Sequence, residues 1–74
     1  MALINEMISG VKNLPNLHDE TDATYYVLQF DDGSKVLQID TVGRNTRDIP
    51  GKVSQSVQFS PAAIAQLKSI LTNF

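Results

Sequence analysis

The sequence predicts a small α+β domain: a three-stranded antiparallel meander flanked by an N-terminal and a C-terminal helix, in the order α-β-β-β-α. Three observations support this prediction. Apolar residues recur at helical spacing near both ends of the chain, two strand-like segments flank an Asp-Gly dipeptide, and a third segment alternates apolar and polar residues. A chain of 74 residues that is 42% hydrophobic and 19% charged has the composition of one folded domain over residues 1–74.

Residues 1–11 have the pattern of a short amphipathic helix. The apolar residues on its predicted face are Leu3, Ile4, Met7, Ile8 and Val11. Gly10 weakens the end of this helix, and Pro15 prevents its easy continuation past Leu14. The opposite side lacks the basic residues of membrane-surface helices, so we expect the helix to pack against the sheet or a partner helix. A polar connection then spans residues 16–24.

A β-hairpin around Asp32-Gly33 is the clearest feature of the sequence. Such a pair is typical of a two-residue turn, which would place Leu28 opposite Leu37 and Phe30 opposite Lys35. The expected apolar face then holds Tyr26, Leu28, Phe30, Leu37 and Ile39. The other face holds Tyr25, Val27, Gln29, Val36, Gln38 and Asp40, and its mixed character indicates a contact surface. A register shift by one residue would mix the two faces, so the pattern favours this register.

The second half of the chain predicts a loop, a strand and a helix. Residues 43–51 contain two glycines and one proline without apolar periodicity, which is typical of a loop. In residues 53–59 the apolar side chains alternate with serine and glutamine, as in a half-buried strand. Ser60 followed by Pro61 is a strong helix start, because serine caps the free N–H groups and proline suits the first helical position.

The candidate binding site lies in residues 43–56. Arginine presents a planar fork of donors that suits phosphate, glycine lets backbone N–H groups approach an anion, and serine hydroxyls add further donors. Ser54 and Ser56 are expected on one strand face, and Tyr25 would offer a ring for stacking a base. The candidate ligand-binding residues are Arg44, Asn45, Thr46, Arg47, Gly51, Lys52, Ser54, Gln55, Ser56 and Tyr25. A partner-protein contact or an ordinary polar surface are the alternatives for this segment.

Several chemistries are disfavoured by the residues present. The chain has no cysteine and a single histidine, so Cys- or His-based metal sites and a catalytic triad are not expected. Asp31-Asp32-Gly33 lacks the alternating ligands of a calcium loop and is interpreted as a turn. Gly51-Lys52 is followed by Val53 rather than serine or threonine, so it is not a phosphate-binding P-loop. We therefore predict no enzyme activity, no cofactor and no metal.

Charge and size indicate the class of partner. Residues 1–40 carry seven acidic and two basic side chains, whereas residues 41–74 carry one acidic and four basic side chains. The formal net charge of −2 argues against binding long duplex DNA, which requires many phosphate contacts. A domain this small without disulfides is expected to self-associate, with a homodimer as first choice. No secretory leader or membrane span is recognised, so we expect a cytoplasmic protein without membrane contact.

Two functions fit these observations. The first is a small, non-catalytic, self-associating binding module that holds or sequesters a phosphate-bearing, nucleotide-like ligand through residues 43–56. The alternative is a protein-binding inhibitor or adaptor, for example a regulator encoded by a phage or mobile element. It would act through its outer sheet face, an open sheet edge or its acidic hairpin.

Overall fold

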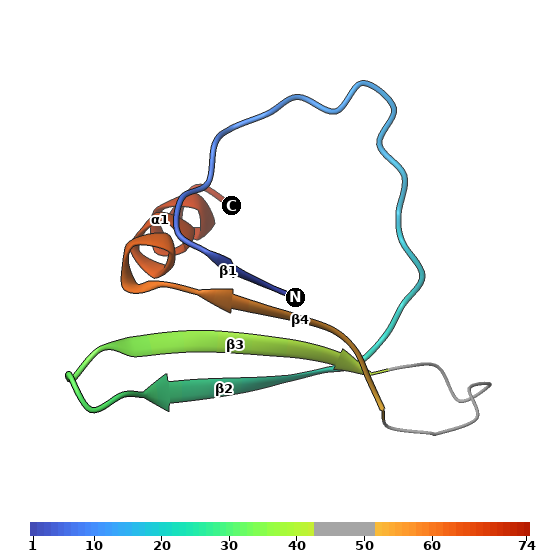
Figure 1. Ribbon diagram of the computed structural model, residues 1–74. Coiled ribbons are helices and arrows are strands. Elements are labelled where there is room, and N and C mark those ends of the chain that lie inside the picture. The colour runs from blue at the N-terminus through green and yellow to red at the C-terminus, as the bar shows by residue number, and fades with distance from the viewer. Residues whose placement is uncertain (43–51) are drawn as a thin grey trace.

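The strand-forming segments assemble into one mixed sheet of four strands in the order β1-β4-β3-β2 (Figure 1). The computed structural model describes residues 1–42 and 52–74. The strands are β1 (Ala2–Ile4), β2 (Ala23–Gln29), β3 (Lys35–Val42) and β4 (Val53–Phe59), and the helix is α1 (Pro61–Thr72). The order of elements is therefore β-β-β-β-α, and the predicted three-stranded antiparallel meander with two flanking helices is wrong.

The N-terminal segment is a strand where a helix was predicted. Ala2 to Ile4 pair in parallel with Val57 to Phe59 at the edge of β4, and the Ser60 N–H extends the pairing by donating to the Ile4 carbonyl at 3.0 Å. An isolated helix of about ten residues is marginal in water, because few hydrogen bonds offset the cost of its first turn. Pairing with β4 satisfies the backbone of this segment and protects an otherwise open sheet edge.

Residues 5–22 contain neither a helix nor a strand and arch away from the sheet (Figure 1). The arch is attached at both ends. At its start, the Gln66 side chain accepts from the Met7 N–H at 2.8 Å and donates to the Met7 carbonyl at 3.1 Å. At its end, the Thr21 hydroxyl donates to the Val42 carbonyl at 2.8 Å. We call residues 8–20, between these attachments, the arm.

The β2–β3 hairpin is present, but its register differs by one residue from the prediction. Leu28 lies opposite Val36, and Val27 lies opposite Leu37. The Phe30 N–H donates to the Ser34 carbonyl at 3.0 Å, so three residues, rather than two, form the loop. Gly33, the last of the three, has φ 86°, a left-handed conformation that glycine adopts without steric cost.

This register separates the sheet into two distinct faces, because successive residues of a strand point to opposite sides. The helix-side face consists of Ala2, Ile4, Ala23, Tyr25, Val27, Gln29, Lys35, Leu37, Ile39, Thr41, Gln55, Val57 and Phe59. The outer face consists of Leu3, Thr24, Tyr26, Leu28, Val36, Gln38, Asp40, Ser56 and Gln58. Val27 and Leu37 line a groove together with Ile64 of α1, which assigns the helix to the first of these faces.

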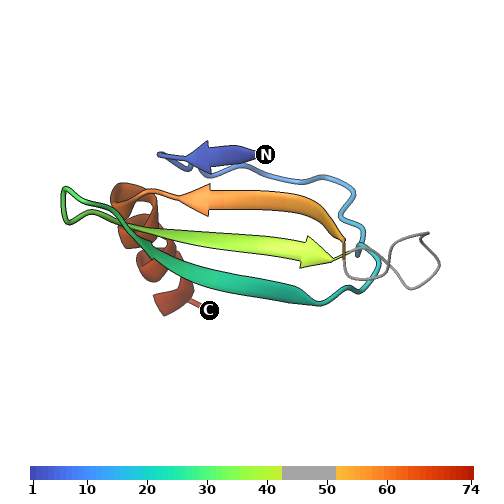
Figure 2. The same ribbon diagram turned by 60° about the horizontal axis from the view of Figure 1, so that its bottom comes forward.

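The helix α1 follows β4 directly, and its predicted start is confirmed. Ser60 is the N-cap, and its hydroxyl oxygen accepts a hydrogen bond from the Ala63 N–H at 3.2 Å. The helix lies on one side of the sheet, near the end that carries the β2–β3 turn (Figures 1 and 2). It therefore covers only part of the helix-side face. In residues 1–42 and 52–74, no helix is long and apolar enough to cross a bilayer.

The interior of a single copy is very small. Val36 and Ala63 are the buried apolar residues of the described part of the chain, and no large side chain there is fully buried. Of the helix-side face, Leu37 and Phe59 remain half-buried, whereas Tyr25 and Val27 are exposed. The sheet therefore has an apolar face that its own helix leaves largely uncovered.

Candidate functional site

The described part of the candidate site lies at the start of β4. Lys52 precedes this strand, and its side chain is exposed. Ser54, Gln55 and Ser56 belong to β4, while Tyr25 lies on β2. The other predicted ligand-binding residues, which are Arg44, Asn45, Thr46, Arg47 and Gly51, lie outside the described residues.

A β-bulge shapes the first residues of β4. Thr41 pairs with Gln55, but the next residue of β3, Val42, pairs with Val53, so Ser54 is the extra residue on β4. The Ser54 hydroxyl lies 2.9 Å from the Thr41 hydroxyl, with either group as donor. A bulge re-aims the side chain of its extra residue and interrupts the alternation of faces. Ser54 is thereby joined to the helix-side face.

Ser56 faces the other way. Its hydroxyl donates to Asp40 Oδ1 at 2.6 Å, and Asp40 is the neighbour of Thr41 on β3. Consecutive strand residues point to opposite sides of a sheet, so the hydroxyls of Ser54 and Ser56 contact residues of opposite faces. The prediction that both serines project from one strand face is therefore wrong, because a sequence pattern cannot reveal the bulge between them.

A row of polar side chains crosses the outer face from β4 to β3. Gln58 Nε2 donates to Gln38 Oε1 at 2.8 Å, and Gln38 Nε2 donates to Asp40 Oδ1 at 3.0 Å. Asp40 is 8% exposed, so its carboxylate is held by Gln38 and Ser56 rather than by bulk water. Polar residues at every second position of both strands are the sequence signal of this row, but the pattern alone does not reveal that their side chains bond to one another. Its donors are engaged within the sheet, so we interpret the row as structural.

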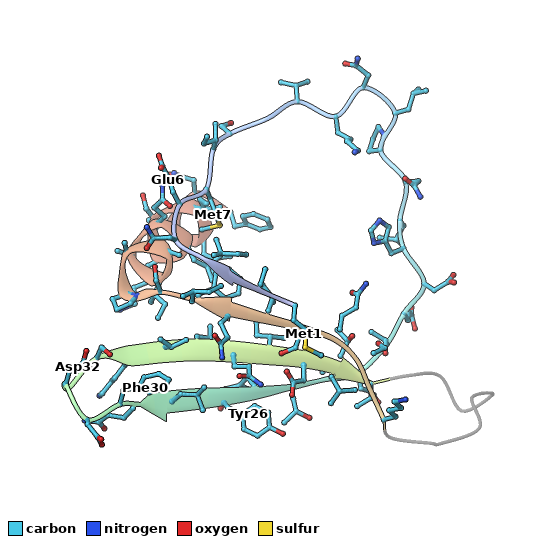
Figure 3. All side chains as sticks on the ribbon, viewed as in Figure 1. Met1, Glu6, Met7, Tyr26, Phe30 and Asp32 are labelled. Carbon is cyan, nitrogen blue, oxygen red and sulfur yellow. The ribbon has the colours of Figure 1, made fainter. Side chains whose placement is uncertain are left out.

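Tyr25 shares the helix-side face with Gln55. It lies opposite Ile39, which in turn lies opposite Val57, so β3 separates the tyrosine from β4. Two strand spacings amount to about 10 Å. Tyr25 is 73% exposed, which leaves its ring free to contact a molecule on this face. The outer face has Tyr26 instead, whose ring points away from α1 (Figure 3).

A shallow hollow on the helix-side face is bordered by Ile39, Thr41 and residues 54–57. Ser56 is among these residues, although its hydroxyl donates to Asp40 on the outer face. Met1 and Ala2 close its other side, and its volume is about 320 Å³. The lining combines the Thr41–Ser54 hydroxyl pair and the polar Gln55 with the apolar residues Ile39 and Val57. This end of the sheet therefore combines exposed hydroxyls with apolar surface, next to the exposed Lys52.

Acidic residues lie at both ends of the sheet. At the end that carries Lys52, the Val42 N–H donates to the Asp22 carbonyl at 3.3 Å, which brings the exposed Asp22 near the end of β3. At the opposite end, Asp31 and Asp32 form the β2–β3 turn, about 25 Å away along the eight residues of β3. Among residues 1–42 and 52–74, an anion bound near Lys52 would thus lie near the carboxylate of Asp22 and far from those of the turn.

The turn carries the one titration shift resolved in the described part of the chain. The Ser34 hydroxyl donates to Asp32 Oδ1 at 2.6 Å, and the Ser34 backbone N–H donates to the same oxygen at 2.9 Å. Both donors stabilise the carboxylate, so the pKa of Asp32 lies below its ordinary value of 3.8. This aspartate is therefore committed to the turn as an acceptor.

The described residues were compared with the geometry of metal sites, and the chain was compared with known proteins. In the part of the chain that the structure describes, no three His, Asp or Glu side chains are grouped so that they could hold a metal ion. No protein-family model, curated protein or solved structure matches the chain.

Proposed function

We propose that this chain is a non-catalytic, self-associating binding module of the cytoplasm. In this proposal it holds a phosphate-bearing, nucleotide-like ligand through residues 43–56. The observation that carries it is the exposed Lys52 next to the Thr41–Ser54 hydroxyl pair, at the end of the sheet where the arginine-containing segment joins β4. A lysine ammonium group and exposed hydroxyls are donors that suit a phosphate, and Arg44 and Arg47 add two guanidinium groups in the same stretch of sequence.

A nucleotide fits this surface better than inorganic phosphate does. The hollow beside Ser54 is lined by Ile39 and Val57, which offer apolar contact to a base or sugar. Tyr25 is exposed on the same face and supplies an aromatic ring. With three cationic side chains between residues 44 and 52 and a net charge of −2, a small ligand is favoured over long duplex DNA.

Isothermal titration calorimetry with mono-, di- and cyclic nucleotides tests this proposal. We expect binding by the unmodified chain and its loss in the double variant Arg44→Ala/Arg47→Ala. The matched control is Lys12→Ala/Lys68→Ala, which removes the same charge from outside the site and should bind normally. The absence of heat with every nucleotide at high protein concentration and low salt would contradict the proposal, as would equal binding by both double variants.

A second candidate function is supported by the open edge of the sheet. β2 is the last strand of the sheet, and an edge strand with unpaired backbone groups can accept a strand from another protein. Exposed Val27 on this strand and the acidic turn beside it would then recognise an inhibitor target or adaptor partner. Val36, expected on the same contact surface as Val27, is buried on the outer face and does not belong to such a site.

Purification from the native host separates these two functions. A protein that copurifies at a fixed ratio, and that is released by Asp31→Asn/Asp32→Asn, supports the inhibitor or adaptor. A copurifying nucleotide that the Arg44→Ala/Arg47→Ala variant does not retain supports the ligand-binding module.

A further inference from the structure

The helix-side face of the sheet is too open for a chain that folds alone. Tyr25 is 73% exposed and Val27 is 65% exposed, although both lie on the apolar face that α1 partly covers. The helix contributes further exposed apolar surface through Ile70 and Leu71. These residues are large, and burying each of them from water would stabilise the fold by roughly 1.5–3 kcal/mol.

The solvent-accessible surface area of the chain can be compared with that of a compact monomer of the same mass. A compact monomer of 8.1 kDa is expected to expose about 4,500 Å². This chain exposes 6595 Å², which is about 2,100 Å² more. Its radius of gyration is 14.8 Å, against about 11 Å for a compact domain of this length. An obligate dimer interface buries roughly 2,000–5,000 Å² in total, or about 1,000–2,500 Å² per chain, and the excess lies within this range.

The arm supplies the complementary surface. Its large apolar residues Ile8, Val11, Leu14 and Leu17 are between 87% and 97% exposed. They recur at every third position, and an extended chain with three residues per turn would place them along one edge. Hydrogen bonds to Gln66 and to Val42 hold the two flanks of the arm, and the segment between them arches away from the sheet (Figures 1 and 3).

We propose that the helix-side face is covered by a second copy of this chain, whose arm lies across it. In this two-fold arrangement each arm contacts the Tyr25–Val27 surface of the other copy, so both helix-side faces and both arms are covered. Such an interface is isologous and closes after two copies, which limits assembly to a dimer. Exposed residues of α1 border the same surface and extend the interface.

A second copy fits better than a different protein for two physical reasons. One chain carries both surfaces, the apolar face and the apolar arm, and in a single copy they do not cover each other. The buried apolar residues of the described part, Val36 and Ala63, form too small a core for independent stability. The covering partner must therefore be present whenever the chain folds, and another copy of the same chain meets that condition.

This inference does not rest on nucleotide binding. It concerns the helix-side face near Val27 and the arm, whereas the proposed ligand contacts are centred on residues 43–56. A dimer that binds no nucleotide would leave the interface intact and reject the proposed function. A monomer that binds nucleotide would do the opposite.

The first test measures the mass in solution of the unmodified chain and of two variants. The variants carry substitutions at adjacent positions of β2. Sedimentation equilibrium of the unmodified chain should give twice 8.1 kDa. Val27→Lys places a charge in the interface and should weaken association at least a hundredfold. Tyr26→Lys places the same charge on the outer face and should leave the mass unchanged. A folded monomer at every concentration, or equal effects of the two variants, would overturn the proposal, and a stable mass above two copies would reject the closed dimer.

Cross-linking between two differently marked chains tests the arm without relying on a destabilised variant. The chain contains no cysteine, so single cysteines can be introduced without background reaction. A refolded mixture of Leu14→Cys and isotope-labelled Val27→Cys should give a cross-link between a labelled and an unlabelled chain with a short bis-maleimide. Replacing Val27→Cys by Tyr26→Cys should abolish it. If Tyr26→Cys cross-links as efficiently as Val27→Cys, or neither reacts between chains, the arm does not lie on the partner's face.

Discussion

Leu28 lies directly opposite Val36 across the β2–β3 hairpin, one residue away from the Leu28–Leu37 pair that a two-residue turn would make. This single shift determines which side chains share a face with α1. It results from a loop of three residues closed by Gly33, whose φ of 86° lies in the left-handed region. The hairpin thus depends on the conformation of one glycine.

Gly33→Ala should therefore destabilise the fold. An added Cβ meets no atom within 4 Å, so the cost arises from the positive φ and amounts to about 1 kcal/mol of unfolding free energy. Gly10→Ala is the matched control, because it also meets no atom within 4 Å and has no positive φ. Urea unfolding of both variants measures the difference, and equal midpoints would show that the turn does not require glycine.

Ser56→Ala should destabilise the sheet more than Ser54→Ala. Ser56 donates to the nearly buried Asp40, so its loss leaves a charged acceptor with one donor fewer and should cost about 1–3 kcal/mol. Ser54 contacts Thr41 at an exposed position where water can replace it, so its loss should cost under about 0.5 kcal/mol. Thermal unfolding under identical conditions ranks the two, and the reverse order would contradict the structural role of the polar row.

Gln66→Ala should release the start of the arch. The Gln66 amide makes two hydrogen bonds to the Met7 backbone, and their loss should lower the unfolding free energy by about 2 kcal/mol. Hydrogen exchange at the Met7 amide should accelerate, because its acceptor is removed. Lys68→Ala alters an exposed position of the same helix and should change neither quantity. If the Met7 amide exchanges at the same rate in Gln66→Ala as in the unmodified chain, the two hydrogen bonds between Gln66 and Met7 do not form in solution.

The Asp32 turn should respond to acid in a defined direction. Donors from Ser34 lower the pKa of Asp32 in the folded state below 3.8, so its contribution is fully present above the unfolded value and is lost as pH falls through the lowered folded pKa. Ser34→Ala should raise the pKa of Asp32 towards 3.8 in an NMR titration. The stability difference between the two proteins should therefore shrink on acidification below about pH 4. A difference that grows on acidification would contradict this assignment.

Local sequence signals were sufficient to predict the elements whose boundaries or faces depend on neighbouring residues. The Ser60-Pro61 helix start predicts α1, because a hydroxyl cap and a proline at the first position act within a few residues. Alternating side chains predict β4 for the same reason. The hairpin was located, but Asp-Gly is compatible with two-residue and three-residue loops, so the register remained open to a one-residue error.

Features that depend on distant residues could not be predicted. β1 exists because Ala2–Ile4 pair with a strand more than fifty residues away, whereas the apolar spacing of the segment also matches a helical stripe. The bulge at Ser54 depends likewise on how β4 meets β3. Of the candidate site, Ser54, Gln55 and Tyr25 lie on the helix-side face, whereas the Ser56 hydroxyl bonds to Asp40 on the outer face.

In the proposed assembly, the folded unit is two copies, each of which covers the helix-side face of the other. Native mass spectrometry of freshly purified, unmodified protein reports the number of copies. We predict a species of twice 8.1 kDa that persists on dilution. A folded 8.1 kDa species at all concentrations, with slow hydrogen exchange in β2 and β3, would show that a single copy is stable and that the dimer is not required.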